Sequence, residues 1–101
     1  MPVAADVTPG KWSEIIILFD NGNYSMIAGI YEENQALGER WNGENGQLGF
    51  PNTAGYPVWH VIPDFLEISV LHGILDEILR NPYPDSQNHI ENIMNEIRRR
   101  I

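Results

Sequence analysis

Three histidines could take part in acid–base or metal chemistry: His60, His72 and His89. His72 and Asp76 are four residues apart, so on a helix they would share one face and could supply two metal ligands. A zinc site needs at least a third protein ligand, and the chain has no cysteine and no HExxH motif to provide it. We therefore expect no metal site and interpret the histidines as partly buried or capping side chains.

The sequence also shows no arrangement typical of a catalytic nucleophile. It has no cysteine and no GxSxG motif, and Glu32 and Glu33 are adjacent, so on a strand their side chains would point to opposite faces. The glycine-rich segment GENGQLG, residues 43–49, lacks the lysine and the strand-to-helix context of a phosphate-binding loop. We therefore predict no catalytic residue and no cofactor, and we expect that the protein is not an enzyme.

The most unusual segment runs from residue 36 to residue 66 and concentrates two tryptophans, three prolines and five glycines. On one interpretation Trp59, Val61 and Phe50 fill the core, while the glycines and prolines shape a loop. On the other, the segment presents an exposed platform of aromatic anchors, a residue type favoured in binding hot spots. The members of this platform would be Trp41, Asn42 and Tyr56.

The same segment carries a resemblance. The strings ALGERWNG and GFPNTAGYPVWHVIPDFL resemble a motif of small bacterial proteins of uncharacterised function, over about residues 24–80. This resemblance implies no catalytic residues. More loosely, a short, acidic, cysteine-free α+β chain is similar in size and charge to the immunity proteins of bacterial toxin systems, including contact-dependent growth inhibition. That likeness implies a partner: a basic nuclease toxin that the immunity protein binds and blocks.

The charge of the chain is negative and uneven. Its 101 residues include 14 acidic and 6 basic side chains, for a formal net charge of -8. Half of the basic residues are the adjacent arginines 98–100, so residues 1–97 carry a net charge of -11. Such a body repels nucleic-acid phosphates, and we expect no direct nucleic-acid binding. It would attract a basic protein by long-range steering, or it would simply keep a small protein soluble.

The elements that must position these residues begin with a β-hairpin. The apolar run 12–19 and the returning strand 24–33 flank Asn21 and Gly22, a strong turn signal. Both faces of the second strand are apolar, which predicts a hairpin in the interior of a sheet, and Gly29 should mark a bulge or a close backbone approach. A third strand is predicted over 36–43, followed by a long loop over 42–57.

A fourth strand is predicted over 58–62, where Pro63 stops it, and helical spacing then predicts a helix over 64–80. Asp64 and Glu67 have the spacing of a capping box. A second helix is predicted over 86–99, with Asp85 or Ser86 as its cap. Its apolar stripe would comprise Ile90, Ile93, Met94, Ile97 and Ile101. Its water-facing side would comprise Glu91, Asn92, Asn95 and Glu96. The arginines 98–100 would complement the helix dipole.

These elements predict an α+β fold in which an antiparallel sheet of about four strands carries two C-terminal helices packed on one face. We expect a single domain over 1–101, with residues 1–11 as a flexible lead-in. No apolar run approaches the roughly 18 residues of a membrane span, and the first residues lack the features of a secretory signal. We therefore expect a cytoplasmic protein without a membrane partner.

The leading hypothesis is an immunity or antitoxin-like protein that occludes the active site of a basic toxin domain, with a nuclease as the expected toxin. Its carboxylates would stand where substrate phosphates lie. Two alternatives remain: a small enzyme or ligand-binding protein that uses the loop 41–59 as a pocket, and a structural module that homodimerises through a sheet edge or the last helix. The predicted partner-binding residues are Asp20, Glu32, Glu33, Glu39, Trp41, Asn42, Glu44 and Tyr56.

Overall fold

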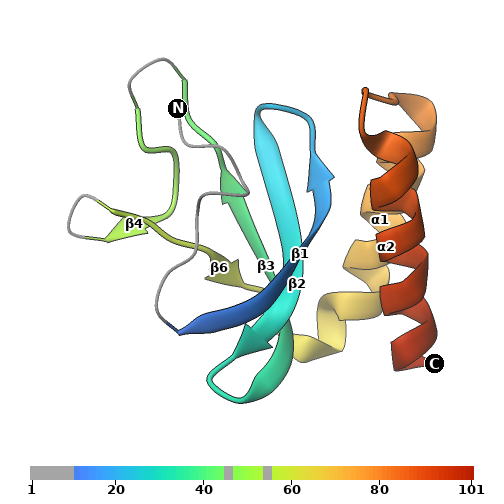
Figure 1. The fold of residues 1–101 in the computed structure, drawn as a ribbon, viewed down its shortest axis with the longest axis horizontal. Coiled ribbons are helices and arrows are strands. Elements are labelled where there is room, and N and C mark those ends of the chain that lie inside the picture. Colours follow the sequence, from blue (N-terminus) through green and yellow to red (C-terminus); the bar gives the residue numbers. More distant parts are fainter. Residues whose placement is uncertain (1–10, 45–46, 54–55) are drawn as a thin grey trace.

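The computed structural model describes residues 11–44, 47–53 and 56–101, and it confirms the predicted α+β class. All four strands of the main sheet are antiparallel to their neighbours, in the order β1-β2-β3-β6 (Figure 1). The strands are β1 (Trp12–Asp20), β2 (Tyr24–Tyr31), β3 (Asn34–Trp41) and β6 (His60–Val61). A separate two-stranded ribbon contains β4 (Asn52–Thr53) and β5 (Tyr56–Pro57). The helical elements are the 3-10 turn η2 (Asp64–Leu66), α1 (Glu67–Arg80) and α2 (Ser86–Arg100). Apart from Lys11, the predicted lead-in lies outside the described residues.

The turn between β1 and β2 is the one predicted from Asn21-Gly22. The side-chain oxygen of Asn21 accepts hydrogen bonds from the backbone N–H groups of Asn23 and Tyr24, both at 2.9 Å. A second tight turn joins β2 to β3, and its two residues, Glu32 and Glu33, both have positive φ, 48° and 74°. Left-handed backbone ends the strand, so the prediction that β2 continues to residue 33 is wrong by two residues.

Two irregularities in β1 decide which of its side chains reach the core. Glu14, at φ 53°, bulges opposite Gly29, where a Cβ atom would lie 3.0 Å from the Ser13 carbonyl oxygen. This confirms the close approach predicted at Gly29. A second register shift at Leu18 breaks the alternation, so both Leu18 and Phe19 are buried in one cluster. Of the two strands of the hairpin, β2 is interior to the sheet and β1 is an edge strand, which corrects the prediction that the whole hairpin is interior.

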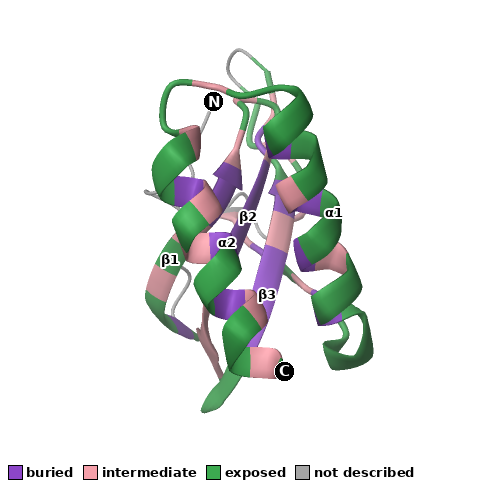
Figure 2. Cartoon of the chain, turned by 90° about the vertical axis from the view of Figure 1, so that its right-hand side faces the viewer, coloured by how far each residue is buried: buried purple, intermediate pink, exposed green. Residues whose placement is uncertain are grey.

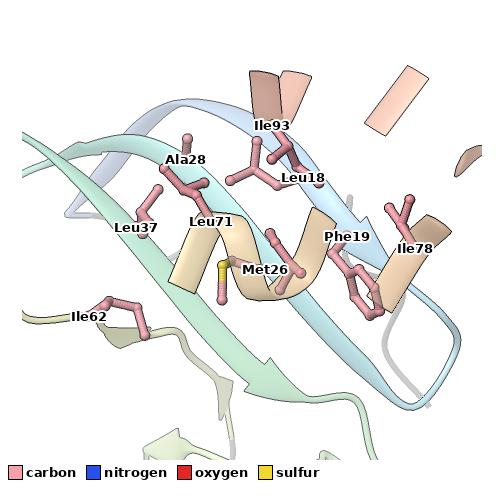
Figure 3. Packing of buried hydrophobic residues seen from close by; sticks show 10 residues of the cluster. Leu18, Phe19, Met26, Ala28, Leu37, Ile62, Leu71, Ile78 and Ile93 are labelled. Carbon is pink, nitrogen blue, oxygen red and sulfur yellow. The ribbon is translucent and has the colours of Figure 1, made fainter. Parts of the chain in front are cut away.

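Both helices cover the same face of the sheet (Figures 1 and 2), as predicted. Their buried side chains point toward the sheet and meet those of the strands in one apolar cluster (Figure 3). The cluster comprises Leu18, Phe19, Met26, Ala28, Leu37, Ile62, Leu71, Ile74, Ile78 and Ile93. A smaller cluster occupies the opposite face and comprises Trp12, Ile27, Ala36 and Trp59. The sheet is therefore apolar on both faces, as its sequence predicted.

The beginning of α1 does not form the capping box that the spacing of Asp64 and Glu67 predicted. No side-chain capping bond is made by Asp64, and η2 separates this residue from α1. Glu67 is instead buried and accepts a hydrogen bond from Nε of Arg100 at 2.7 Å. The prediction that Glu96 faces water is wrong, because it is 4% exposed and also pairs with Arg100, at 2.8 Å. An ionic network thus fastens the beginning of α1 to the end of α2.

The apolar stripe of α2 is narrower than predicted. Ile93 is fully buried, and Ile90 and Ile97 pack against the core, whereas Met94 and Ile101 are exposed. Asp85 occupies the N-cap position without a side-chain capping bond. Glu91 and Asn95 are exposed as predicted, but half-buried Asn92 is not, because its amide donates to the Ile17 carbonyl across the helix–sheet boundary at 3.1 Å.

Candidate functional site

The loop between β3 and β6 is built around the guanidinium of Arg40, which is 1% exposed. Its Nη1 donates to the carbonyls of Pro51, at 3.2 Å, and Val58, at 2.8 Å, and its Nη2 donates to the carbonyl of Leu48. Its carbon centre lies 6.0 Å from the ring centroid of Trp59. Burial lowers the pKa of Arg40. One side chain thereby connects three separate positions of the loop.

Backbone pairing then fixes the direction in which two aromatic side chains point. Trp41 and Phe50 form an antiparallel bridge, with N–H to carbonyl distances of 2.6 and 2.9 Å. Directly opposed residues project to the same side, so the two rings share one surface. Gly49, at φ 76°, lets the chain approach this closely, because a Cβ atom there would lie 2.1 Å from the Trp41 carbonyl oxygen.

Asn42 ties the loop to the β1–β2 hairpin. Its Oδ1 accepts from the hydroxyl of Ser25 at 2.7 Å, and its Nδ2 donates to the carboxylate of Asp20 at 3.1 Å. Its backbone N–H donates to the carbonyl of Asn23 at 2.8 Å. Asn42 is 2% exposed. The prediction that Asn42 lines an exposed platform is therefore wrong, since its polar groups are already satisfied by the fold.

Trp41 is 58% exposed and Phe50 is 67% exposed. The exposure of Trp41 agrees with the platform interpretation, and the burial of Trp59 agrees with the core interpretation. The prediction that Phe50 fills the core is wrong, because the bridge to Trp41 turns its side chain outward. Trp41 packs edge-on against Tyr24, with ring centroids 5.2 Å apart, while Trp59 belongs to the cluster on the opposite face of the sheet.

A line of polar contacts crosses three strands beside these rings. The hydroxyl of Tyr24 donates to Oε1 of Glu39 at 2.5 Å, and Nδ1 of His60 lies 3.1 Å from Oε2 of the same carboxylate. Burial and then the bond to Glu39 raise the pKa of Tyr24, so its hydroxyl stays a donor. Alternation along β3 places Glu39 and Trp41 on the face that carries Leu37, which is the helix-covered face.

We call the set formed by Tyr24, Glu39, Trp41, Phe50 and His60 the Trp41 surface. It surrounds a hollow of about 180 Å³, to which Arg40 and Pro51 also contribute. A wider hollow of about 520 Å³ lies between Trp41 and the loop residues Leu48, Phe50 and Asn52. The arrangement offers aromatic walls, one partly exposed carboxylate and one exposed imidazole, which suits binding of a cationic or aromatic group.

The structure brings only some of the predicted partner-binding residues to the Trp41 surface. Glu44 is exposed and lines a further hollow beside Trp41, and Asp20 lies behind Asn42. Glu32 and Glu33 are at the opposite end of the sheet, where Glu32 pairs with Lys11 at 2.8 Å. The eight predicted residues therefore do not form one surface.

The predicted platform member Tyr56 belongs to β5, and nothing is described of its side chain. Sequence reasoning missed Tyr24 and His60 as members of the Trp41 surface, and Arg40 as its support. The pairing of Tyr24 with Trp41 follows from the two-residue turn at 32–33, but the sequence carries no turn signal at Glu32-Glu33 that would have indicated it. Nothing in the sequence indicated which carbonyls Arg40 would meet.

Comparison with known proteins adds no relative: no family model, curated protein or solved structure matches this chain. The resemblance to small bacterial proteins and to immunity proteins therefore stays a prediction. Within residues 11–44, 47–53 and 56–101, no helix is long and apolar enough to cross a membrane. The same residues contain no group of three histidine or carboxylate side chains placed to hold a metal ion.

Proposed function

We propose that this protein binds a basic protein partner through the Trp41 surface. The observation that carries the proposal is the exposure of Trp41 and Phe50 on a backbone held in place by Arg40 and Asn42. Large aromatic side chains gain most when a partner removes them from water. Because the fold already orders the backbone beneath them, little conformational entropy would be lost on binding.

The charge of the molecule supports a basic partner. The chain carries a net charge of -8, and Glu39 and Glu44 border the exposed rings. Opposite charge steers diffusional encounter, while the aromatic contacts resist dissociation. Glu32 and Glu33, at the far end of the sheet, would add to the long-range field without touching the partner.

The finer proposal is an immunity function. The partner would be a toxin domain, most simply a nuclease whose basic groove ordinarily holds nucleic-acid phosphates. A carboxylate at Glu39 or Glu44 would occupy a phosphate position, and Trp41 would cover the groove. The small size and acidic charge of the chain support this proposal, as does the position of these carboxylates beside exposed aromatic rings.

A growth-rescue assay tests this function. The chain is coexpressed with the protein encoded next to its gene, and growth is compared with that of cells expressing the neighbour alone. We expect the neighbour to be toxic and the chain to relieve the toxicity. The double substitution Trp41→Ala/Phe50→Ala should abolish relief, because it removes both exposed anchors.

The matched control is Phe65→Ala/Leu79→Ala, which removes two apolar side chains of η2 and α1 that are at least as exposed as Trp41. This control should still relieve toxicity. A neighbour that neither inhibits growth nor binds the chain contradicts the immunity function. Equal loss of relief in both double variants contradicts the assignment to the Trp41 surface.

A second candidate function is the binding of a small ligand by the loop 41–59. The hollow of about 520 Å³ between Trp41, Leu48 and Phe50 favours it, since ligand sites are concave and apolar with a few polar groups. A thermal-shift screen of metabolites separates the two functions. A ligand that stabilises the unaltered chain but not Leu48→Ala would favour this candidate.

A further inference from the structure

The geometry points to a guanidinium site in the hollow of about 180 Å³ at the Trp41 surface, filled by one arginine side chain of the partner. This inference rests on the proposed function and specifies the chemistry of the partner's central residue. Three aromatic rings and one carboxylate wall the hollow, namely Tyr24, Trp41, Phe50 and Glu39. Cations are attracted to aromatic faces, and a planar guanidinium stacks on them and bonds carboxylates in a fork.

Glu39 can accept further hydrogen bonds. Each of its carboxylate oxygens makes one described bond, Oε1 with Tyr24 and Oε2 with His60, and a carboxylate offers about four acceptor positions in all. Its side chain is 31% exposed, so the charge is partly removed from water while remaining accessible. Partial desolvation strengthens a charge-assisted hydrogen bond beyond its value at an open surface.

Arg40 also lines the hollow, but its charge lies beneath the wall and not on its accessible surface. Its guanidinium is 1% exposed and directs its Nη groups at the carbonyls of Leu48, Pro51 and Val58. The accessible carboxylate on the hollow wall is Glu39, which lies beside the exposed imidazole of His60, in a chain of net charge -8. An acidic ligand would have to approach both the carboxylate and this overall field.

The same contacts explain why the hollow keeps its shape without a ligand. Tyr24 is held between the Trp41 ring and the Glu39 carboxylate, and burial together with that carboxylate raises the pKa of its hydroxyl, so it continues to donate. Glu39 is consequently oriented before a partner arrives. A preoriented acceptor loses less entropy on binding.

The inference is tested on the free protein by NMR titration with N-acetyl-arginine methylamide. N-acetyl-citrulline methylamide, which has a similar shape and no charge, is the matched probe, and ionic strength is held constant. We expect the arginine probe to shift the backbone amides of 39–41 and the Trp41 indole N–H. The citrulline probe should shift them much less.

Glu39→Gln removes the charge but keeps an oxygen that can accept from Tyr24, so the fold should be retained. It should eliminate the arginine-specific shifts, whereas Glu32→Gln, with the same change in net charge at the far end of the sheet, should preserve them. In the complex, Glu39→Gln should weaken partner binding by about 10- to 100-fold, the value of one charge-assisted hydrogen bond.

Three results would overturn the guanidinium site: no shifts up to the solubility limit of the arginine probe, equal shifts with citrulline, or shifts with acetate that map to the same hollow. The proposed function is judged separately. Growth rescue that persists while the arginine probe fails rejects only the guanidinium site. Specific arginine binding without toxicity or rescue rejects only the immunity function.

Discussion

Two arginines, the buried Arg40 and the partly buried Arg100, hold the two ends of this molecule, and their charges are compensated in opposite ways. Arg100 donates to the carboxylates of Glu67 and Glu96 and to the Glu96 carbonyl at 2.7–2.9 Å. In the described part of the chain, Arg40 donates only to backbone carbonyls. Burial lowers the pKa of each, but at Arg100 the bonds to Glu96 and Glu67 outweigh it and raise the pKa.

The difference follows from what each arginine joins. Arg100 connects two helices that both contribute buried side chains to one apolar cluster, Ile78 from α1 and Ile93 from α2, so its ion pairs add to a core. Arg40 lies on the inner side of a loop from which Trp41 and Phe50 point outward. It orders the loop by hydrogen bonds to the loop's carbonyls. One arginine therefore supports the fold, and the other supports the Trp41 surface. Substitutions can separate these two roles.

The largest expected effect is that of Arg100→Met. The change leaves Glu67 and Glu96 buried without their main partner, and breaking a buried ion pair on one side costs about 3–5 kcal/mol. We expect a loss of this size in the free energy of unfolding measured in urea. Arg98→Met removes the same charge from the same helical turn, but Arg98 is exposed and bonds only Asn95 in the described structure, so it should cost less than about 1 kcal/mol. Equal effects of the two substitutions would show that the network does not hold the helices together.

The two tryptophans provide the next comparison. Trp59 is 5% exposed in the cluster with Trp12, so Trp59→Ala should destabilise the fold by about 3–5 kcal/mol. Trp41→Ala should cost less than about 1 kcal/mol, since its ring is largely in water, and should weaken partner binding. Urea unfolding and the growth-rescue assay measure the two effects. Destabilisation by Trp41→Ala equal to that by Trp59→Ala would show that the exposed ring is part of the fold.

The sequence predicted the features that depend on local pattern. Alternation and the Asn21-Gly22 turn indicated the hairpin, and helical spacing of leucine and isoleucine indicated both helices and the side on which they pack. The sequence did not predict which charged side chains are buried. Glu67 and Glu96 look like a cap and a solvated residue, and only the meeting of distant segments at Arg100 makes their burial favourable. Phe50 likewise looks like a core residue until its backbone pairs with Trp41.

A smaller effect on stability is expected from Arg40→Met. Its loss takes away the Arg40 donor from the carbonyls of Leu48 and Val58, while the Pro51 carbonyl keeps the backbone N–H of Val58, and a loop at the surface can reopen to water, so we expect about 1–3 kcal/mol. The distinctive readout is local. Amide hydrogen exchange at Phe50 and Trp41 should accelerate, exchange in α2 should not, and growth rescue should be lost. Arg80→Met, at an exposed i,i+4 ion pair with Asp76, is the control. Equal loss of protection in the helices and in the loop would contradict the separation of roles.

The smallest expected effect tests whether the beginning of α2 is coupled to the Trp41 surface. His89 is buried, and its Nδ1 lies 2.7 Å from the hydroxyl of Tyr83, which accepts the backbone N–H of Asp20 at 3.0 Å. Asp20 in turn bonds Asn42 beneath the Trp41 surface. A Tyr83 hydroxyl that accepts from Asp20 keeps its own proton free to donate to Nδ1 of His89 whenever that nitrogen is unprotonated. Burial lowers the pKa of His89, against the weaker opposing effect of Asp85 and Asp20.

Since the folded-state pKa of His89 lies below its ordinary value of about 6.5, the unfolded chain takes up the proton first. The stability linked to neutral His89 is therefore complete above about pH 6.5 and is lost as the pH falls through the lower folded-state pKa.

Urea midpoints of the unaltered chain should decline between about pH 7 and 5.5, and those of His89→Gln should decline less. His72→Gln, at an exposed position of α1, should retain the full decline. If His89 is coupled to the Trp41 surface, the same acidification should also accelerate amide exchange at Asn42, and this acceleration should be absent in His89→Gln. Faster exchange at Asn42 in both proteins would place the acid-sensitive group outside His89, and an unchanged rate in both would show that the hydrogen bonds of Asp20 do not transmit the loss.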